Sequence, residues 1–380
     1  MKIGQFTDTF LPIVDGVGRV VYSYADTLAR KGHECYVVAP MADTGYQGRL
    51  PFELIEFVSF GIPTQRQYNS GIPQFDAHYE ARISKIPLDI IHVHSPFIAG
   101  KEALRLGRKR NIPVIGMFHS RYYDDFYKLT RAEMLANIGV RYIISFYERC
   151  DEVWTVSQSS AETLSDYGYR GDVVVMPNGT PEVMPSASNL LLARETFHLP
   201  DRNLLLYCGQ LNWKKNILCI LEACAILKRG GQPFTLALVG QGPDTHAIER
   251  KVQELALGDC TIFTGHITQE CLLFGLYEAA SLFVFPSLYD TSGMVVREAA
   301  AMETPSVVVA GSAAAEPITD GMNGLLCMNS ADHLAAVIKR ALSAPDSLSV
   351  IGQQARKTIY LSWDRIIDQA LVRYENLIGR

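Results

Sequence analysis

The stretch PSLYDTSGMVVREAA, residues 286–300, holds two carboxylates, Asp290 and Glu298, that are separated by seven residues. The apolar run LFVFPS before it predicts a buried strand, and SGMVVREAA predicts the start of a helix. Amides that open a helix favour a negatively charged ligand, which would suit a diphosphate here. Four backbone amides would take this part, those of Ser292, Gly293, Met294 and Val295.

The two carboxylates allow more than one interpretation. Glu298 could accept two hydrogen bonds from the vicinal diol of a ribose, while Asp290 accepts one from a sugar hydroxyl. Alternatively, both acids only stabilise the helix dipole. A glycosidase pair is a third possibility, but such enzymes need carboxylates on either side of one glycosidic bond, and nothing here predicts the raised pKa of a general acid.

Two other stretches could bind a phosphate. The turn LPIVDGVGRVV would open the first helix, where Gly16 and Gly18 would let the amide of Val17 approach an anion. It lacks the third glycine of a dinucleotide fingerprint, so a purely structural turn is an equal alternative. Lys215 in CGQLNWKKNILCI lies at a predicted strand-to-helix junction and could face the same ligand, or be an ordinary surface residue. Lys214 beside it is expected to be solvated.

The elements that must position these residues alternate between strand and helix. Strands are predicted by MKIGQF, YVVA, LDIIHVHS and PVIGMFHS in the first half, and by LLLYCG, FTLALVG, CTIFTG, LFVFPS and PSVVVAG in the second. This alternation predicts an α/β protein of two facing Rossmann-like domains with a ligand cleft at the carboxyl ends of their strands.

Domain boundaries follow from one break in the pattern. The proline- and serine-rich stretch VVVMPNGTPEVMPSASNL predicts a linker, which gives an N-terminal domain over 1–180 and a C-terminal domain over 181–362. Residues from about 331 onward predict helices, and we expect the last one, over 363–380, to pack back toward the N-terminal domain.

Composition excludes several classes of protein. The 380 residues carry a formal net charge of −5, which gives no overall drive toward nucleic acid. The eight cysteines are scattered and form no CxxC pair, so buried free thiols are expected rather than disulfides or a zinc site. The start lacks the features of a signal peptide, and no segment is long and apolar enough to span a membrane. We therefore expect a cytoplasmic protein that could meet the inner face of the membrane only peripherally.

In the order and spacing of these motifs the chain resembles the retaining, nucleotide-sugar-dependent glycosyltransferases of family four, which have the GT-B fold. The resemblance runs from FTDTFLPIVDGVGRVV through IIHVHSPF, GMFHSRYYDDF, VMPNG, YCGQLNWKKNI, LVGQGP and FVFPSLYDTSGMVVREAAAMETPSVV to DGMNGLL. TDTFLPIVDGV, HVHSPF and FHSRYYDDFY are most similar to the branch that glycosylates diacylglycerol and related lipids.

The resemblance implies how the donor's diphosphate and ribose are held. Gly16 and Val17 would offer backbone amides to the diphosphate, and Lys215 would neutralise its charge. Glu298 would bind the ribose.

The resemblance also implies where sugar and base lie. Asp290 and the amides that open the following helix would bind the transferred sugar. His119 in FHS would lie near the reaction centre, with a structural histidine as the alternative. His266 and Ile267 would belong to the loop that binds the base.

The implied reaction moves a hexose from a nucleoside diphosphate sugar, with UDP-glucose or a similar UDP sugar expected, to a lipid hydroxyl with retention of configuration. His119, Asp290 and Lys215 are the expected catalytic residues. Helix amides and Lys215 would stabilise the leaving diphosphate, so neither metal nor cofactor is expected. The leaving phosphate would help to deprotonate the acceptor.

Three departures from the family pattern keep alternatives open. Gln210 stands where the family has arginine, Asp290 where it has glutamate, and Glu303 where it has glycine. The arginine's loss could slow transfer by roughly one to two powers of ten. One alternative is a degenerate homologue that binds nucleotide sugar without turnover. Another is an enzyme that glycosylates a soluble sugar, a small metabolite or a polysaccharide precursor. A dehydrogenase fits poorly, since the fingerprint is incomplete.

The first domain offers a surface for a lipid acceptor. ALRLGRKRNI, at residues 103–112, and SRYYDDFYKLTRAEMLANIGVRYIISFYERC, at 120–150, combine basic and aromatic residues that could rest on an anionic membrane. A solvated helix face is the alternative. Donor base, donor sugar, acceptor, linkage and oligomeric state are not determined by these patterns.

Overall fold

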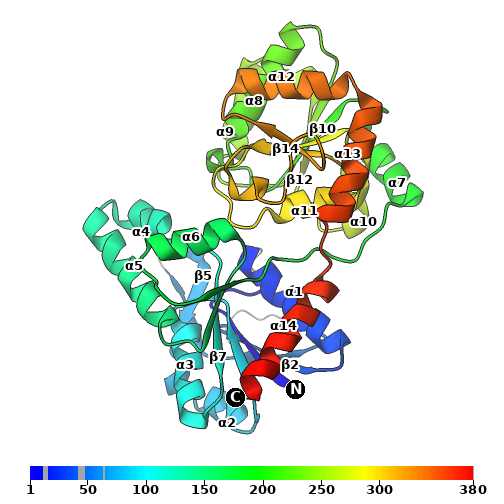
Figure 1. The fold of residues 1–380 in the computed structure, drawn as a ribbon. Helices are drawn as coiled ribbons and strands as arrows, with labels where there is room; N and C mark the ends of the chain where they lie inside the picture. Colours follow the sequence, from blue (N-terminus) through cyan, green and yellow to red (C-terminus); the bar gives the residue numbers. More distant parts are fainter. Residues whose placement is uncertain (12–15, 42–47, 63–64, 380) are drawn as a thin grey trace. The chain divides into compact units, whose positions relative to one another are not determined.

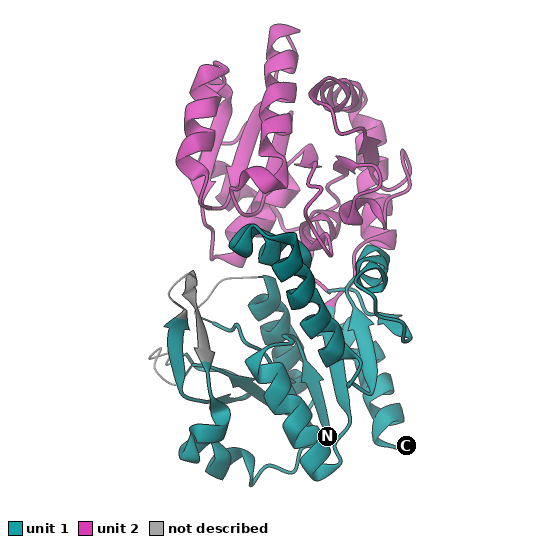
Figure 2. Cartoon of the chain, turned by 90° about the vertical axis from the view of Figure 1, so that its left-hand side faces the viewer, with its two compact units in different colours: residues 1–178, 363–380 teal, residues 179–362 magenta. Residues whose placement is uncertain are grey.

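The computed structural model describes residues 1–11, 16–41, 48–62 and 65–379, and its elements are labelled in Figure 1. Residues 12–15, part of the predicted phosphate-binding turn, lie outside the described residues. The chain forms two compact units (Figure 2), unit 1 over 1–178 and 363–380 and unit 2 over 179–362. The boundary lies two residues before the one predicted from the linker.

Unit 1 is built on a seven-stranded parallel sheet in the order β3-β2-β1-β6-β7-β8-β9. Its strands are β1 Lys2–Phe6, β2 Glu34–Ala39, β3 Glu53–Glu56, β6 Ile90–Val93, β7 Val114–Phe118, β8 Glu152–Thr155 and β9 Val173–Val175. Its helices are α1 Gly16–Arg30, α2 Ala77–Ile83, α3 Ile98–Arg110, α4 Tyr122–Thr130, α5 Glu133–Tyr147, α6 Gln158–Asp166 and α14 Trp363–Ile378. Strands β6 and β7 are buried along their whole length, as strands covered by helices on both faces must be.

Unit 2 repeats this architecture with a six-stranded parallel sheet in the order β12-β11-β10-β13-β14-β15. Its strands are β10 Leu204–Cys208, β11 Thr235–Val239, β12 Thr261–Gly265, β13 Leu282–Phe285, β14 Ser306–Val309 and β15 Leu325–Cys327. Its helices are α7 Ala187–Phe197, α8 Ile217–Arg229, α9 Thr245–Glu254, α10 Glu270–Ala279, α11 Met294–Ala301, α12 Ala331–Leu342 and α13 Pro345–Thr358. The prediction of two Rossmann-like domains is confirmed.

Both sheets reverse their strand order at one place, the switch point, which lies between β1 and β6 in unit 1 and between β10 and β13 in unit 2. The loops after these strands diverge to opposite sides and leave a crevice at the carboxyl edge, which is where ligands of open α/β sheets bind. Every candidate residue of unit 2 except His266 and Ile267 follows β10 or β13.

The helix α14 returns to unit 1 and packs on α1. Lys31 contacts Asp368 at 2.7 Å, and Tyr374 stacks on Trp154 with ring centres 5.7 Å apart. Because Trp154 and Tyr374 are fully buried, this last helix forms part of the core of the first domain.

The structure corrects three expectations. The predicted linker is wrong at both ends, because its first residues form β9 and its last residues begin α7. An antiparallel hairpin of β4 Ser59–Ile62 and β5 Gln65–Gly71 interrupts the alternation and was not predicted. All eight cysteines are free, but only Cys35, Cys219, Cys224 and Cys327 are buried, whereas Cys150, Cys208 and Cys260 are half-buried and Cys271 is exposed.

Candidate functional site

The centre of the candidate site in unit 2 is an ion pair between Lys215 and Asp290. Lys215 ends the short 3-10 turn Trp213–Lys215 after β10, and Asp290 follows β13. Lys215 Nζ lies 3.0 Å from Asp290 Oδ2 and donates to the carbonyl of Tyr289 at 3.0 Å. The two side chains are 22% and 17% exposed, so this ion pair is largely buried but still in contact with solvent.

Asp290 also binds the start of helix α11. Its Oδ1 accepts hydrogen bonds from the amides of Ser292 at 3.1 Å and Gly293 at 2.9 Å. Burial by itself would raise the pKa of Asp290, but the charge of Lys215 and the bonds from Gly293 and Ser292 outweigh it and hold the pKa below its usual value. Asp290 is therefore an anion at neutral pH.

The four amides predicted to face a ligand thus divide into two pairs. Those of Ser292 and Gly293 donate to Asp290 rather than facing outward, because the short side chain folds back on the loop. Gly293 has φ 56° and precedes the helix, while Met294 and Val295 are its first two residues. The positive end of the α11 dipole, at Met294, is still available to an anionic ligand.

Glu298 lies one turn into α11 and is 3% exposed. Its Oε2 accepts a hydrogen bond of 2.9 Å from the phenol of Tyr277, which is itself fully buried. A buried carboxylate needs such a donor to offset its lost hydration. The hydrogen bond from Tyr277 therefore holds the Glu298 side chain in one orientation, about one turn after the start of α11.

Glycines let the loops after β10 and β11 approach each other closely. Gly209 and Gly240 have φ values of 153° and 128°, and a Cβ on Gly240 would lie 2.0 Å from the carbonyl oxygen of Gly209. Gln210, in the first of these loops, is exposed. His266, after β12, is also exposed, whereas Ile267 packs against the core of unit 2.

Lys214 is more constrained than predicted. Its side chain is exposed, but its Nζ lies 4.4 Å from the ring centre of Tyr289. The two neighbouring lysines therefore contact the same loop, one through an aromatic ring and one through Asp290 and a backbone carbonyl.

The remaining candidates belong to unit 1. Gly16 begins α1 and is exposed, and a Cβ there would meet nothing within 4 Å, so packing among the described residues does not require glycine at this position. Val17 is half-buried and Gly18 is buried. Phosphate binding at Gly16 needs an open backbone at a helix start, which is what the structure has. A glycine in a purely structural turn would have an equally open backbone.

His119 follows β7 and is 6% exposed. Burial lowers its pKa to about 3, so the imidazole is neutral at physiological pH. Its Nε2 lies 3.0 Å from Nδ1 of His94, whose Nε2 lies 2.7 Å from Oε1 of Gln5. Neither Gln5 nor His94 was predicted from the sequence as a site residue. The alternation in HVHS, which puts two histidines on one face of a strand, was the available signal.

Asp8 is a further candidate residue that was not predicted from the sequence. It follows β1, and its Oδ1 accepts a hydrogen bond of 3.0 Å from the amide of Ala99 at the start of α3. Burial raises its pKa to about 7, against the effect of the hydrogen bonds from α3. The nearby switch point of unit 1 thus holds a carboxyl group that is partly protonated at neutral pH.

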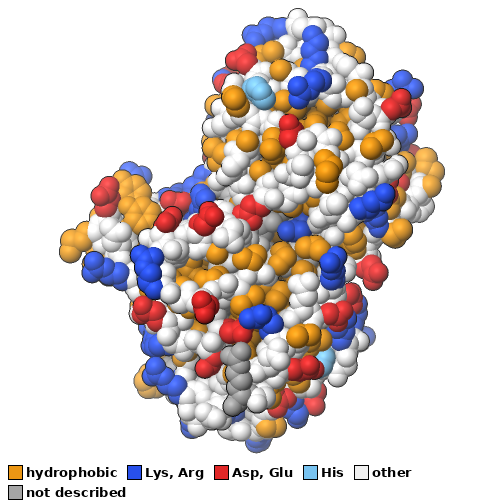
Figure 3. Space-filling model, viewed as in Figure 1, with side chains coloured by type: hydrophobic (Ala, Val, Ile, Leu, Met, Phe, Trp, Pro, Cys, Tyr) orange, Lys and Arg blue, Asp and Glu red, His pale blue; other side chains and the backbone are white. Residues whose placement is uncertain are grey.

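The α4–α5 hairpin presents apolar side chains to solvent. Figure 3 shows hydrophobic side chains at the exposed end of the α4–α5 hairpin, with basic side chains beside them. Five exposed apolar residues lie there, Tyr127 at 44%, Leu129 at 55%, Met134 at 74%, Leu135 at 51% and Ile138 at 51% exposure. Exposed apolar side chains that cluster mark an interaction site more often than singly scattered ones do.

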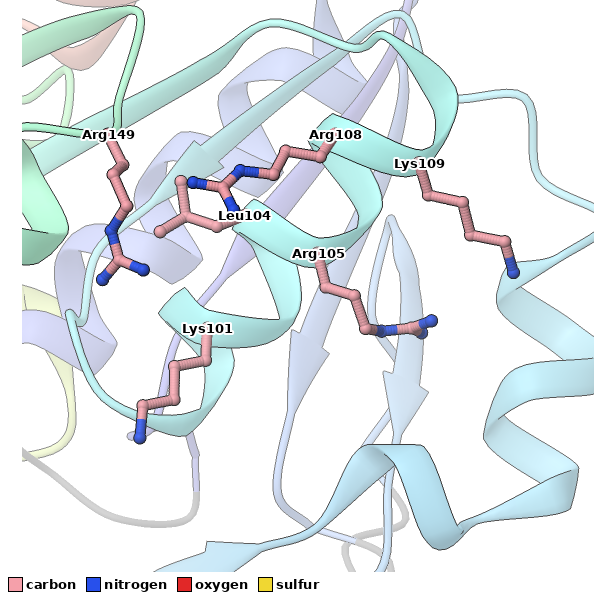
Figure 4. A pocket seen from close by; sticks show the side chains of 6 residues that line it. All are labelled: Lys101, Leu104, Arg105, Arg108, Lys109 and Arg149. Atoms are coloured by element: carbon pink, nitrogen blue, oxygen red, sulfur yellow. The ribbon is translucent and has the colours of Figure 1, made fainter.

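A basic hollow of about 560 Å³ lies beside α3 (Figure 4). It is lined by Lys101, Leu104, Arg105, Arg108, Lys109 and Arg149. Arg105 pairs with Glu80 and with the buried Glu102. Among the described residues, no acidic side chain forms an ion pair with any of the other four basic side chains.

Two other features are not found among the described residues. No group of three or more histidine, cysteine, aspartate or glutamate side chains in the described ranges could hold a metal ion. In the same part of the chain, no helix has both the length and the apolar character needed to cross a membrane.

Comparison with known proteins gives similarity along nearly the whole chain. The model of Glycosyltransferase Family 4 matches residues 14–182, and that of Glycosyl transferases group 1 matches residues 192–358. The chain is 27% identical over 356 residues to the alpha-monoglucosyldiacylglycerol synthase of Streptococcus pneumoniae, which covers 91% of this chain and 79% of that protein. It is 24% identical over 333 residues to the GDP-mannose-dependent alpha-mannosyltransferase of Corynebacterium glutamicum, covering 86% and 76%.

Solved structures share the fold. The crystal structure of HepE from Anabaena in complex with UDP superposes with a TM-score of 0.78 at 16% identity, covering 99% of this chain and 100% of that one. At this level of identity the likeness concerns the fold of the two domains.

Proposed function

Because the chain belongs to the family 4 glycosyltransferases of the GT-B fold, we propose that it transfers a hexose from a UDP sugar to a lipid hydroxyl at a membrane surface. The observation that supports this best is the Lys215–Asp290 pair at the switch point of unit 2, beside the start of α11. The names of the relatives favour the lipid acceptor, since one of them is a synthase of a glucosylated diacylglycerol.

In the proposed reaction, the bond between the sugar's anomeric carbon and the diphosphate breaks while the acceptor oxygen bonds to the same face of that carbon. The acceptor's proton passes to the leaving phosphate oxygen. Negative charge develops on the diphosphate, and Lys215 and the α11 dipole are the groups of unit 2 that would stabilise it. Such stabilisation is our reason to propose a reaction that needs no metal.

Asp290 would have two tasks in this scheme. It holds Lys215 and the loop before α11 in place through both of its oxygens, and it is an anion that can accept from a sugar hydroxyl. Its position between lysine and helix would set the distance between the diphosphate and the transferred sugar. Glu298, oriented by Tyr277, would accept from the ribose diol.

A thermal-shift screen of the purified protein tests the donor. We expect UDP to raise the melting temperature more than GDP or ADP do, with the same shift in EDTA, since a ligand that binds only the folded state stabilises it. A shift that EDTA abolishes would contradict metal independence. No shift with any of these nucleotides, in a well-folded sample, would favour the degenerate homologue, while hydrolysis of a nucleotide sugar would exclude it.

Glu298→Ala is expected to lower UDP affinity by about 10 to 100-fold, because a hydrogen bond to a charged group contributes about 1.5–3 kcal/mol. Tyr277→Phe is the matched control, because it removes the same buried hydrogen bond but keeps the carboxylate. We expect both variants to lose melting temperature, and Glu298→Ala to lose more UDP affinity than Tyr277→Phe, which keeps the carboxylate, measured by titration calorimetry. Unchanged UDP affinity in folded Glu298→Ala would assign Glu298 a structural role only.

The acceptor side of the proposal rests on the α4–α5 hairpin and the basic hollow of α3. Apolar tips that enter a bilayer and basic side chains that approach anionic headgroups both favour membrane binding, at about 1 kcal/mol per basic residue near the surface. Unit 1 has both features, in segments that the sequence analysis associates with the acceptor.

Vesicle flotation tests this surface. We expect the protein to float with vesicles that contain phosphatidylglycerol, and Leu135→Glu in the hairpin to reduce the bound fraction at least about threefold, since a charge in an apolar interface costs free energy. Leu191→Glu is the matched control, because Leu191 lies on α7 of unit 2 with a similar exposure, 58% against 51%. Equal binding by both variants would remove the hairpin from the proposal. Transfer to a water-soluble acceptor without vesicle binding would favour the soluble alternative.

A further inference from the structure

Three side chains form a continuous hydrogen-bonded row across the switch point of unit 1. Gln5 belongs to β1, His94 follows β6, and His119 follows β7, so they come from three adjacent strands. Gln5 Oε1 lies 2.7 Å from His94 Nε2, and His94 Nδ1 lies 3.0 Å from His119 Nε2. The two ring planes are nearly parallel, at 21°, with centres 5.3 Å apart, as in-plane hydrogen bonding between the rings requires.

Both rings of this Gln5–His94–His119 row are neutral, because burial lowers the pKa of His119 to about 3 and that of His94 well below its usual value. A neutral imidazole has one nitrogen that donates and one that accepts. The two ends of such a row are therefore coupled, since fixing the proton on one ring decides which nitrogen of the next ring carries its proton.

The amide oxygen of Gln5 fixes the polarity. An amide oxygen can only accept, so His94 must donate from Nε2 and accept at Nδ1. His119 must then donate from Nε2, which leaves the lone pair on its Nδ1. Of the three clustered histidines, His92 and His94 are completely buried and His119 alone reaches the surface of unit 1, at 6% exposure.

We propose that Gln5 and His94 are positioning residues that hold His119 in its Nε2–H tautomer, so that Nδ1 presents a hydrogen-bond acceptor to a substrate hydroxyl. This inference rests on the proposed function. In this state His119 cannot donate to a phosphate oxygen, and it takes no proton in the reaction. Its part is to accept from a hydroxyl of the sugar or the acceptor and so orient it, while the acceptor's proton still goes to the leaving phosphate.

The neighbours of the row explain why it stays in place. His92, in β6 two residues before His94, has its ring centre 4.3 Å from that of His94, and its Nδ1 lies 2.7 Å from the hydroxyl of Tyr374 in α14. Tyr24 packs edge-on against both of these histidines. Rings confined in this way cannot turn over to exchange their two nitrogens without opening the core.

The test is nitrogen NMR of the full chain labelled with ¹⁵N-histidine. Long-range proton–nitrogen spectra distinguish the two neutral tautomers, and His119→Gln identifies the signals of His119. We expect His94 and His119 to be Nε2–H tautomers in the wild type. Gln5→Leu should convert His119 to a mixture of both forms, and Gln5→Glu, whose carboxylate accepts as the amide oxygen does, should keep the Nε2–H form.

Turnover gives the second readout. We expect Gln5→Leu to lower kcat about tenfold, as the loss of one hydrogen bond predicts, with little change in KM for the nucleotide sugar, and Gln5→Glu to restore most of it. An Nδ1–H tautomer in the wild type, or an unchanged tautomer in folded Gln5→Leu, would overturn the inference. The spectra need no activity, so absence of transfer in the wild type would count against the proposed function and leave the tautomer result to be judged by itself.

Discussion

Lys215→Met is expected to lower kcat/KM for the nucleotide sugar by about 10² to 10³-fold, the loss that follows removal of one preorganised group from a developing anion. The ammonium is held by Asp290 and the carbonyl of Tyr289 at 3.0 Å each, so other groups of unit 2 fix its position. Its loss also leaves a largely buried carboxylate without its counter-ion. Steady-state kinetics with a radiolabelled donor measure the effect.

Lys214→Met is the matched control for this prediction. It removes the same charge one residue earlier, from an exposed side chain over the ring of Tyr289, and we expect a change of less than about threefold. Lys215→Arg should retain part of the activity, because a guanidinium also binds phosphate. Similar losses in Lys214→Met and Lys215→Met would show that general positive charge matters here, rather than a positioned group.

Acid is expected to unfold unit 1 before unit 2. His92, His94 and His119 are buried with lowered pKa values, whereas the histidines of unit 2, His198, His246, His266 and His333, are exposed. Below pH 6.5 the unfolded chain binds protons at the three buried histidines and the folded unit does not. Stability therefore falls with pH toward the folded pKa values, by about 4 kcal/mol per pH unit for three such groups.

Asp8 offsets about a third of this slope. Its pKa is raised from 3.8 to about 7, so the folded unit binds a proton there that the unfolded chain does not, and acid in that range stabilises the fold at this group. The net effect is still a loss of stability between pH 6.5 and about 4, because three groups oppose one.

Pulsed hydrogen exchange with mass spectrometry measures this on the whole protein after incubation at each pH. We expect peptides from β1, β6 and β7 to lose protection at a higher pH than peptides from β10, β11 and β13. His94→Asn should make the loss in unit 1 less steep, by about one buried histidine. Simultaneous loss in both units, or earlier loss in unit 2, would mean that protons do enter the histidine cluster of the folded protein.

The architecture could be predicted from local patterns along the chain. Strand and helix alternate with clear apolar patterns, and parallel strands joined by helices leave few other folds. The helix start after LFVFPS and the spacing of Asp290 and Glu298 were also visible, because they depend on residues close together in the chain. The interruption of this alternation by the β4–β5 hairpin could not be predicted, because the hairpin depends on the pairing of its two strands and not on an apolar run.

The contacts between residues far apart in the chain could not be predicted in this way, because they depend on how the strands are ordered in the folded domain. Lys215 and Asp290 are joined because the sheet of unit 2 reverses its order between β10 and β13, and Gln5 meets His94 because β1 pairs with β6. In the folded domain Asp290 also accepts hydrogen bonds from the amides of Ser292 and Gly293, which were predicted to face a ligand. Local patterns report secondary structure, but strand order and burial, which set contacts and pKa values, depend on the whole domain.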